Sequence, residues 1–137
     1  MAKPNCIFCE IVRGKLPSYK IYEDKYVLAF APKKEDIITQ GHMLIIPKKH
    51  FESIYDIPQK EMDHVMRAVK LIARKLRDKH KFEGINILHA SGEVAQQSVP
   101  HFHLHLAPRK RNDGLDTWPK TGYKEKDFPG IYKKIRL

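Results

Sequence analysis

Residues 97–108 read QSVPHFHLHLAP, and this stretch decides more of the fold than any other. Histidines and apolar residues alternate strictly from residue 101 to residue 106. Successive side chains of a β-strand point to opposite faces of the sheet, so the pattern predicts a strand with one apolar face and one histidine face. We expect the apolar face to meet the core and the histidine face to line a cleft or meet solvent. The two faces comprise His101, His103 and His105 on one side, and Phe102, Leu104 and Leu106 on the other.

The three histidines are too far apart to share one metal ion on a straight strand. Residues i and i+4 of a strand lie about 13 Å apart at about 3.3 Å per residue. Zinc holds its ligand nitrogens at about 2 Å, so two neighbouring histidines could share it but all three could hardly do so. We therefore expect the histidines to divide their tasks, with one imidazole acting as a nucleophile or general base and the next orienting it.

The segments around the histidines predict an antiparallel sheet. Short runs of apolar and β-branched residues are bounded by proline, glycine and charged residues, which is typical of strands joined by loops. Residues 31–41 and 91–97 predict loops. The expected strands are two within residues 20–30 around a turn at residues 23–25, and one each in residues 42–47, 84–89 and 99–108.

Residues 59–79 predict one long helix. Apolar residues recur there at intervals of three and four, and charged residues fill the other positions. About five strands with one long helix packed on them make an α+β fold. The expected buried stripe of the helix comprises Met62, Val65, Met66, Val69, Ile72, Ala73 and Leu76.

The length and composition exclude several classes of protein. A chain of 137 residues corresponds to one domain. Its 42% hydrophobic and 31% charged residues exclude a disordered chain, and the lack of a run of about 18 apolar residues excludes a membrane-spanning protein. Two cysteines cannot build a disulfide scaffold. Residues 1–9 lack the apolar stretch of a signal peptide, so the expected compartment is the cytoplasm.

The net charge of +10 favours anionic ligands such as nucleotides, phosphorylated substrates or nucleic acid. Residues 109–137 hold nine basic and four acidic residues, so half of the net charge lies in this C-terminal stretch. No finger, helix–turn–helix or basic motif interleaved with aromatic residues accompanies the charge. Lysine also serves plain solubility, so we do not expect dedicated nucleic-acid binding.

The pattern His-φ-His-φ-His-φ-φ, in which φ is apolar, resembles that of the histidine triad (HIT) nucleotide hydrolases and transferases. Residues 101–107 fit it at every position. Residues 6–18 are similar to the opening of bacterial HIT proteins, and residues 41–50 are similar to the central strand of the family. The resemblance implies a single HIT domain over residues 1–137, with a core at about 6–109 and a basic tail at 110–137.

The resemblance implies chemistry at the α-phosphate of a purine nucleotide. In the family, the middle histidine attacks this phosphorus and forms a covalent nucleotidyl-histidine that water resolves, which makes His103 the expected nucleophile. The resemblance further implies that the carbonyl of His105 holds the His103 ring, that His105 lies by the phosphate, and that His42 supports the pair. His101 completes the catalytic set. His42 alone would also suit an ordinary strand histidine.

The resemblance also assigns residues to the nucleotide. Gln97 and Ser98 match contacts to the phosphate and leaving group, where hydrogen-bond donors stabilise developing charge, although loop polarity alone would explain them. An apolar slot for the purine is implied as well, and each of its residues would equally suit plain core. The implied slot consists of Ile7, Phe8, Ile11, Phe30 and Leu44.

Two departures from the family pattern bear on nucleotide affinity. Many members carry Asn eleven residues before the first triad histidine, where this chain has Ala90 with Ser91 beside it as a substitute. The loop at residues 31–41 is about two residues longer than usual, which leaves Glu35 or Asp36 to bind the ribose hydroxyls.

Cys6 and Cys9 are the only cysteines and form a Cys-x-x-Cys pair. Such spacing is typical of a zinc site or a redox centre, and two buried thiols or a reversible disulfide are further alternatives. A subset of bacterial HIT proteins carries the same pair. That resemblance implies a structural zinc site completed by His50 and His101, and it implies no catalytic metal.

Three functional interpretations remain beside a nucleoside phosphoramidase. The implied substrates include acyl-nucleotides and dinucleoside polyphosphates, so a dinucleoside polyphosphate hydrolase is one alternative. A low-turnover nucleotide- or nucleic-acid-binding protein is a second, and a zinc-stabilised interaction protein is a third. The resemblance also implies a homodimer. Trp118 could cover the site or lie at the dimer interface, and the histidines expected only at the surface or in packing are His64, His80 and His89.

Overall fold

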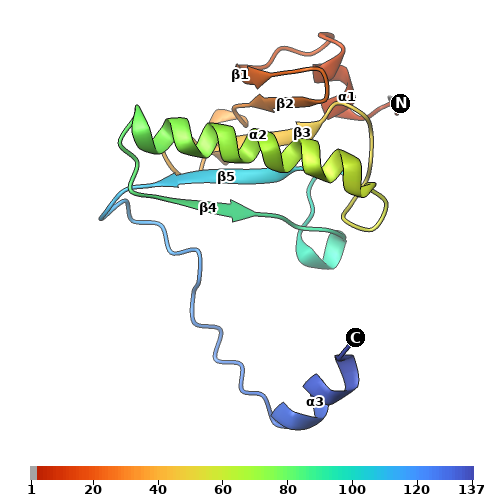
Figure 1. Ribbon diagram of the computed structural model, residues 1–137, viewed down its shortest axis with the longest axis vertical. Coiled ribbons are helices and arrows are strands. Elements are labelled where there is room, and N and C mark those ends of the chain that lie inside the picture. Colours follow the sequence, from red (N-terminus) through yellow and green to blue (C-terminus); the bar gives the residue numbers. More distant parts are fainter. Residues whose placement is uncertain (1–2) are drawn as a thin grey trace.

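Five antiparallel strands in the order β1-β2-β3-β5-β4 form the sheet of the computed structural model, which describes residues 3–137 (Figure 1). The long helix α2 (Gln59–Asp78) crosses one face of the sheet. The predicted α+β fold of about five strands and one long helix is therefore confirmed. The strands are β1 (Lys20–Glu23), β2 (Val27–Phe30), β3 (Met43–Pro47), β4 (Gly84–Leu88) and β5 (Leu104–Arg109).

The central strands β2 and β3 are buried along their whole length because both faces of the sheet are covered. Alternate residues of each strand join different clusters, as the period of two requires. Val27, Ala29, Met43 and Ile45 face α2, together with Phe102. The other cluster lies on the opposite face, against the short helix α1 (Ile7–Val12), and comprises Cys6, Phe8, Cys9, Leu28, Phe30, Leu44 and Ile46.

Helix α2 buries one narrow stripe against the first cluster. The stripe is centred on Ala68 and Val69, and it also includes Val65, Ile72 and Leu76. The expectation that Met66 belongs to it is wrong, because 42% of this residue is exposed. One residue turns a helix by about 100°, so Met66 is carried away from the sheet when Val65 points into it.

Strand β5 begins at Leu104, whereas residue 99 was the expected start. Pro100 lacks an N–H, and residues 99–103 form irregular backbone instead of a ladder. There the N–H of His101 donates to the carbonyl of Val99, and the N–H of Phe102 donates to the carbonyl of Phe51. The first two triad histidines therefore lie in a bent segment, and only His105 lies within the strand.

Residues 110–137 leave the sheet as an extended tail that ends in the helix α3 (Phe128–Ile135), which the sequence analysis did not predict (Figure 1). None of these residues is buried. Arg109, the last residue of β5, holds the start of the tail: its guanidinium donates to both carboxylate oxygens of Asp113 and to the carbonyl of Leu115. Two short 3-10 helices, η1 (Lys34–Asp36) and η2 (Glu93–Ala95), lie in the loops. Among residues 3–137, no helix has both the length and the apolar character needed to cross a bilayer.

Candidate active site and metal centre

Three imidazoles, from β5 and from the segments that lead into β3 and β5, meet on the sheet face opposite α2. His42 directly precedes β3, and its Nε2 lies 3.0 Å from Nδ1 of His105. The rings of His105 and His103 have their centroids 5.1 Å apart. Antiparallel pairing places Leu44 opposite His105, and this register brings the start of β3 beside the start of β5. The structure thus assembles the row His42–His105–His103.

The ring of His103 is held by its own segment of backbone. Its Nδ1 donates to the carbonyl of His101 at 2.7 Å. A carbonyl oxygen can only accept, so the proton resides on Nδ1 and Nε2 keeps its lone pair. The expectation that the carbonyl of His105 holds this ring is wrong. The bend at residues 99–103 turns the His101 carbonyl toward the ring, while His105 already belongs to the ladder of β5.

The hydrogen bonds also assign the protons of His42 and His105. The backbone N–H of Ile38 donates to Nδ1 of His42 at 3.3 Å, which leaves the proton of His42 on Nε2. This Nε2–H donates to Nδ1 of His105. His105 consequently carries its own proton on Nε2, where it can donate to a bound anion. The site therefore combines an imidazole lone pair on His103 with an imidazole N–H on His105.

Burial keeps these rings neutral. It lowers the pKa of His103 and of His42 below the ordinary value of 6.5. Burial also lowers the pKa of His105 to about 4, with additional repulsion from His103 and His42. A buried imidazole loses the hydration that stabilises its cation, so the neutral form dominates near pH 7. Neutral His103 is the form that has a lone pair to share with phosphorus.

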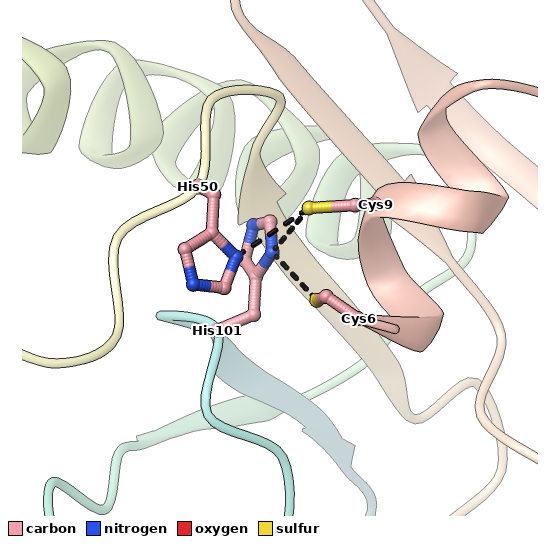
Figure 2. A group of neighbouring side chains, drawn as sticks. All are labelled: Cys6, Cys9, His50 and His101. Carbon is pink, nitrogen blue, oxygen red and sulfur yellow. Dashed lines mark hydrogen bonds between the residues drawn. The ribbon is translucent and has the colours of Figure 1, made fainter. Parts of the chain in front are cut away.

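A second cluster joins Cys6, Cys9, His50 and His101 (Figure 2). Their potential ligand atoms all lie within 4.8 Å of one another, and the predicted four-residue set is thus brought together. Cys6 occupies the N-cap position of α1 and Cys9 lies one turn further, so both thiols project from one side of the helix. His50 comes from the segment after β3, and His101 comes from the bend before β5.

The donor set fits a tetrahedral metal ion. Sγ of Cys6 and Sγ of Cys9 lie 3.5 and 3.7 Å from Nδ1 of His101, and Sγ of Cys9 lies 3.4 Å from Nδ1 of His50. Zinc bonds of about 2.0 Å to nitrogen and 2.3 Å to sulfur separate neighbouring ligand atoms by about 3.5 Å in a tetrahedron. Nε2 of His101 donates to the carbonyl of Pro47 at 2.9 Å, which leaves Nδ1 free to bind a metal. These four residues could hold a metal ion.

The residues assigned to the nucleotide occupy different settings. Phe8 lies edge-on to the rings of His101 and His103, with centroid distances of 5.8 and 5.3 Å, and it packs on Phe30. Leu44 is buried in the same cluster, and Ile11 packs against that cluster. Ile7 is 45% exposed. Phe8 therefore contacts the triad rings, whereas Phe30, Leu44 and Ile11 share or adjoin its cluster and Ile7 is exposed.

Gln97 connects two loops through its amide. Its Nε2 donates to the carbonyls of Glu52 and Val99, and its Oε1 accepts from the N–H of Gly92. The neighbouring Ser98 is exposed. In this conformation the Gln97 amide holds the loop that leads into the triad. Its amide could contact a phosphate only after breaking hydrogen bonds to these backbone groups.

His89 contacts the triad directly, although its place in the sequence predicted only a surface or packing residue. Its Nδ1 lies 2.8 Å from the carbonyl of His103, and its Nε2 lies 2.5 Å from Oγ of Ser91. The signal was present in the sequence, because His89 is the last residue of a predicted strand and Ser91 lies two residues beyond it. Only the pairing of that strand with the triad strand shows where the imidazole goes.

The chain matches one protein family and is similar to an enzyme of named activity. The model of the HIT domain family matches residues 13–112. Adenosine 5′-monophosphoramidase HNT1 of Saccharomyces cerevisiae is 36% identical over 130 residues, which is 93% of this chain and 77% of that protein.

Two solved structures share the fold. A HIT family protein from Bacillus subtilis is 42% identical with a TM-score of 0.80 and covers 97% of each chain. A zinc-bound histidine triad family protein from Mycobacterium smegmatis is 35% identical with a TM-score of 0.77, covering 85% of this chain and 84% of that one.

Proposed function

The chain is a member of the HIT domain family, and on that premise we propose that it transfers or hydrolyses nucleotidyl groups at the α-phosphate of purine nucleoside 5′-phosphoramidates. The observation that carries the proposal is the hydrogen bond from Nδ1 of His103 to the carbonyl of His101, which leaves Nε2 free to attack. The substrate class follows the name of the yeast relative, adenosine 5′-monophosphoramidase.

The proposed reaction has two displacements at phosphorus. First, Nε2 of His103 forms a bond to the α-phosphorus, the bond from phosphorus to the leaving nitrogen breaks, and the leaving amine takes up a proton from water. Positive charge then develops on the His103 ring, where the carbonyl of His101 stabilises the Nδ1 proton. In the second step water attacks the same phosphorus, the bond to Nε2 breaks, and the nucleoside monophosphate leaves with release of one proton.

His105 and His42 stabilise the charge on the phosphoryl group. Nε2–H of His105 donates to a phosphoryl oxygen, and His42 fixes the tautomer that makes this possible through its 3.0 Å contact with Nδ1 of His105. Preorganised donors stabilise developing charge without rearranging during the reaction. This division of labour gives the row of three imidazoles one nucleophile, one donor and one orienting residue.

The four-residue cluster is proposed to hold structural zinc. The ligands would be Cys6, Cys9, His50 and His101, and a zinc ion bound by all four would supply a cross-link rather than an open catalytic position. The chain segments joined in this way are α1, the residues after β3 and the bend at residues 99–103. Burial lowers the pKa of His50 and His101, the latter to about 4, which favours the neutral imidazoles that metals bind.

A homodimer in the cytoplasm is proposed as the working state. β4 lies at the edge of the sheet with Ile87 47% exposed, and α2 exposes Met66 and Leu71 on its outer side. An uncovered edge strand and an apolar helix surface are suited to pairing with a second copy. Both cysteines are free thiols in this structure, and a reducing compartment preserves thiols for metal binding.

Steady-state kinetics on two substrates tests the proposed activity. Adenosine 5′-phosphoramidate and a diadenosine polyphosphate are compared with wild type and His103→Ala. We expect kcat/KM to be at least about tenfold higher for the phosphoramidate, and we expect the variant to lose at least about 10³-fold in kcat. A higher kcat/KM for the diadenosine polyphosphate would show that dinucleoside polyphosphates, and not phosphoramidates, are the substrate class. Tight nucleotide binding without turnover would favour the binding-protein alternative.

A further inference from the structure

We propose that His89 is a positioning residue for the nucleophile, because its Nδ1–H holds the peptide carbonyl of His103 while Ser91 holds the other side of its ring. This inference rests on the proposed function of His103. It assigns a task to a side chain that contacts the triad from the neighbouring strand.

The contact between His89 and the carbonyl of His103 lies just beyond the end of the pairing between β4 and β5. The backbone pairing of β4 and β5 ends at Leu88 opposite His105. Next along the chain, the imidazole of His89 reaches the carbonyl of His103 at 2.8 Å. A side-chain donor therefore occupies the place of the next backbone rung, where the chain after β4 turns into the loop at residues 91–97.

A chain of hydrogen bonds, called the relay below, links Ile54, Ser91, His89 and the carbonyl of His103. The carbonyl of His103 can only accept, so Nδ1 of His89 carries the proton. Nε2 of His89 lies 2.5 Å from the hydroxyl oxygen of Ser91, which accepts from the N–H of Ile54 at 2.8 Å. The relay runs from the loop after β3, through Ser91 and His89, to the backbone of the nucleophile.

Packing restrains the His89 ring between its two hydrogen bonds. The ring lies against Phe102, with centroids 4.6 Å apart and planes inclined by 35°. Phe102 is fully buried, so it cannot yield to let the imidazole shift. An imidazole fixed at both nitrogens and on one face is a rigid support for the peptide that it contacts.

His103 is then anchored at two points, and each anchor controls a different coordinate. The carbonyl of His101 sets the rotation of the His103 ring, and His89 sets the peptide plane that follows the residue. The bend at residues 99–103 is outside the regular ladder, so the backbone there has fewer restraints than a strand would give it. A displacement of about 1 Å at a reacting group can cost about 10²-fold in rate, which makes such an anchor consequential.

Two substitutions of His89 distinguish the effect of its hydrogen-bond donor from the effect of its aromatic ring. His89→Asn places an amide N–H near the position of Nδ1, whereas His89→Phe keeps the ring on Phe102 but removes the donor. We expect His89→Phe to lower kcat by about 10- to 100-fold with KM changed less than about twofold, and His89→Asn to stay within about threefold of wild type. His80→Asn, at an exposed position after α2, is the matched control. Thermal unfolding confirms that every variant is folded.

Ser91→Ala tests the second part of the relay. It removes the hydroxyl that fixes Nε2 of His89, while the donor on Nδ1 remains, so we expect a loss in kcat of about three- to tenfold, between those of the two His89 variants. A folded His89→Phe with kcat within twofold of wild type would overturn the inference. So would a folded His89→Asn as slow as His89→Phe.

Nitrogen-15 NMR of the histidine side chains supplies a readout that does not depend on turnover. The resonances of His89 are identified by their loss in His89→Asn, and we expect the tautomer protonated on Nδ1. The tautomer protonated on Nε2 would overturn the contact itself. A wild-type protein without turnover would refute the proposed function and the positioning role together, whereas active wild type with an indifferent His89→Phe would refute the positioning role alone.

Discussion

The carbonyl of His101 accepts the Nδ1 proton of His103 at 2.7 Å, while Nδ1 of His101 faces the two cysteine thiols. One residue therefore belongs to both centres: its side chain is a candidate metal ligand, and its backbone orients the candidate nucleophile. His101 is fully buried, and its Nε2 is fixed by the carbonyl of Pro47. A restraint on the side chain of His101 is thereby also a restraint on the ring of His103.

Metal analysis of the purified protein is expected to find about one zinc ion per chain. Cys9→Ser should lose it, because Sγ of Cys9 faces both His50 and His101, and it should lower both the unfolding temperature and kcat. His80→Asn should keep the metal and the stability. A metal-free wild type that unfolds at the same temperature with and without a chelator would contradict the zinc assignment.

Activity should fall only on the acid side of the ordinary histidine pKa of 6.5. Burial lowers the pKa of His103 below 6.5 and that of His105 to about 4. The active state needs a neutral nucleophile, so kcat/KM should be flat from about pH 8 to about pH 6.5 and should fall at lower pH. An acid limb with an apparent pKa above 7 would contradict the buried, neutral His103.

The same shift makes stability depend on pH in a defined direction. In the unfolded chain His105 takes up its proton near pH 6.5, whereas in the folded chain it does so only near pH 4. The unfolded state therefore binds more protons in this interval, and the free energy of unfolding should fall as pH drops from about 6.5 to about 4. Urea unfolding at pH 7.5, 6 and 5 measures this free energy. A free energy of unfolding that rises toward acid pH would contradict the lowered pKa of His105.

Two alanine substitutions on α2 test which side of the helix faces the sheet. Ile72 is 5% exposed and belongs to the first cluster, whereas Met66 is 42% exposed. Ile72→Ala should reduce the free energy of unfolding by about 2–5 kcal/mol, since it leaves a cavity in the core. Met66→Ala should change the free energy of unfolding by less than about 0.5 kcal/mol. Equal losses would show that Met66 is also buried, for example against a second copy.

Truncation after Leu115 should leave the folded domain intact. Residues 116–137 contribute no buried side chain, and the contacts of Arg109 with Asp113 and Leu115 are retained. We expect an unfolding temperature within about 2 °C of the full chain by scanning calorimetry. A larger decrease would show that the tail contributes to stability, as it would if it packed on a partner subunit.

The sequence predicted the elements whose patterns are local. The strands at 20–23 and 27–30 follow from short apolar runs around a polar turn, and the helix at 59–78 follows from spacings of three and four. The bend at residues 99–103 could not be predicted in this way, because the alternation of histidine and apolar residues continues through it. Pro100 was the available signal, and it marks where the ladder fails.

The candidate site was predictable in its residues but not in its connections. The triad, His42 and the cysteine pair were all identified from spacing and from the family resemblance. The carbonyl that holds His103 was assigned to His105 rather than His101, since backbone direction in a bend is not encoded in side-chain alternation. The contact of His89 depends on the register of β4 with β5, which the sequence alone does not fix.

A single-turnover experiment tests the central claim most directly. Wild type and His103→Ala are mixed with adenosine 5′-phosphoramidate radiolabelled at phosphorus, quenched at short times, and analysed for acid-labile label on the protein. We predict label on wild type that appears before free adenosine monophosphate, and none on the variant. Turnover without any trapped label, or equal label on His103→Ala, would contradict a covalent intermediate on His103.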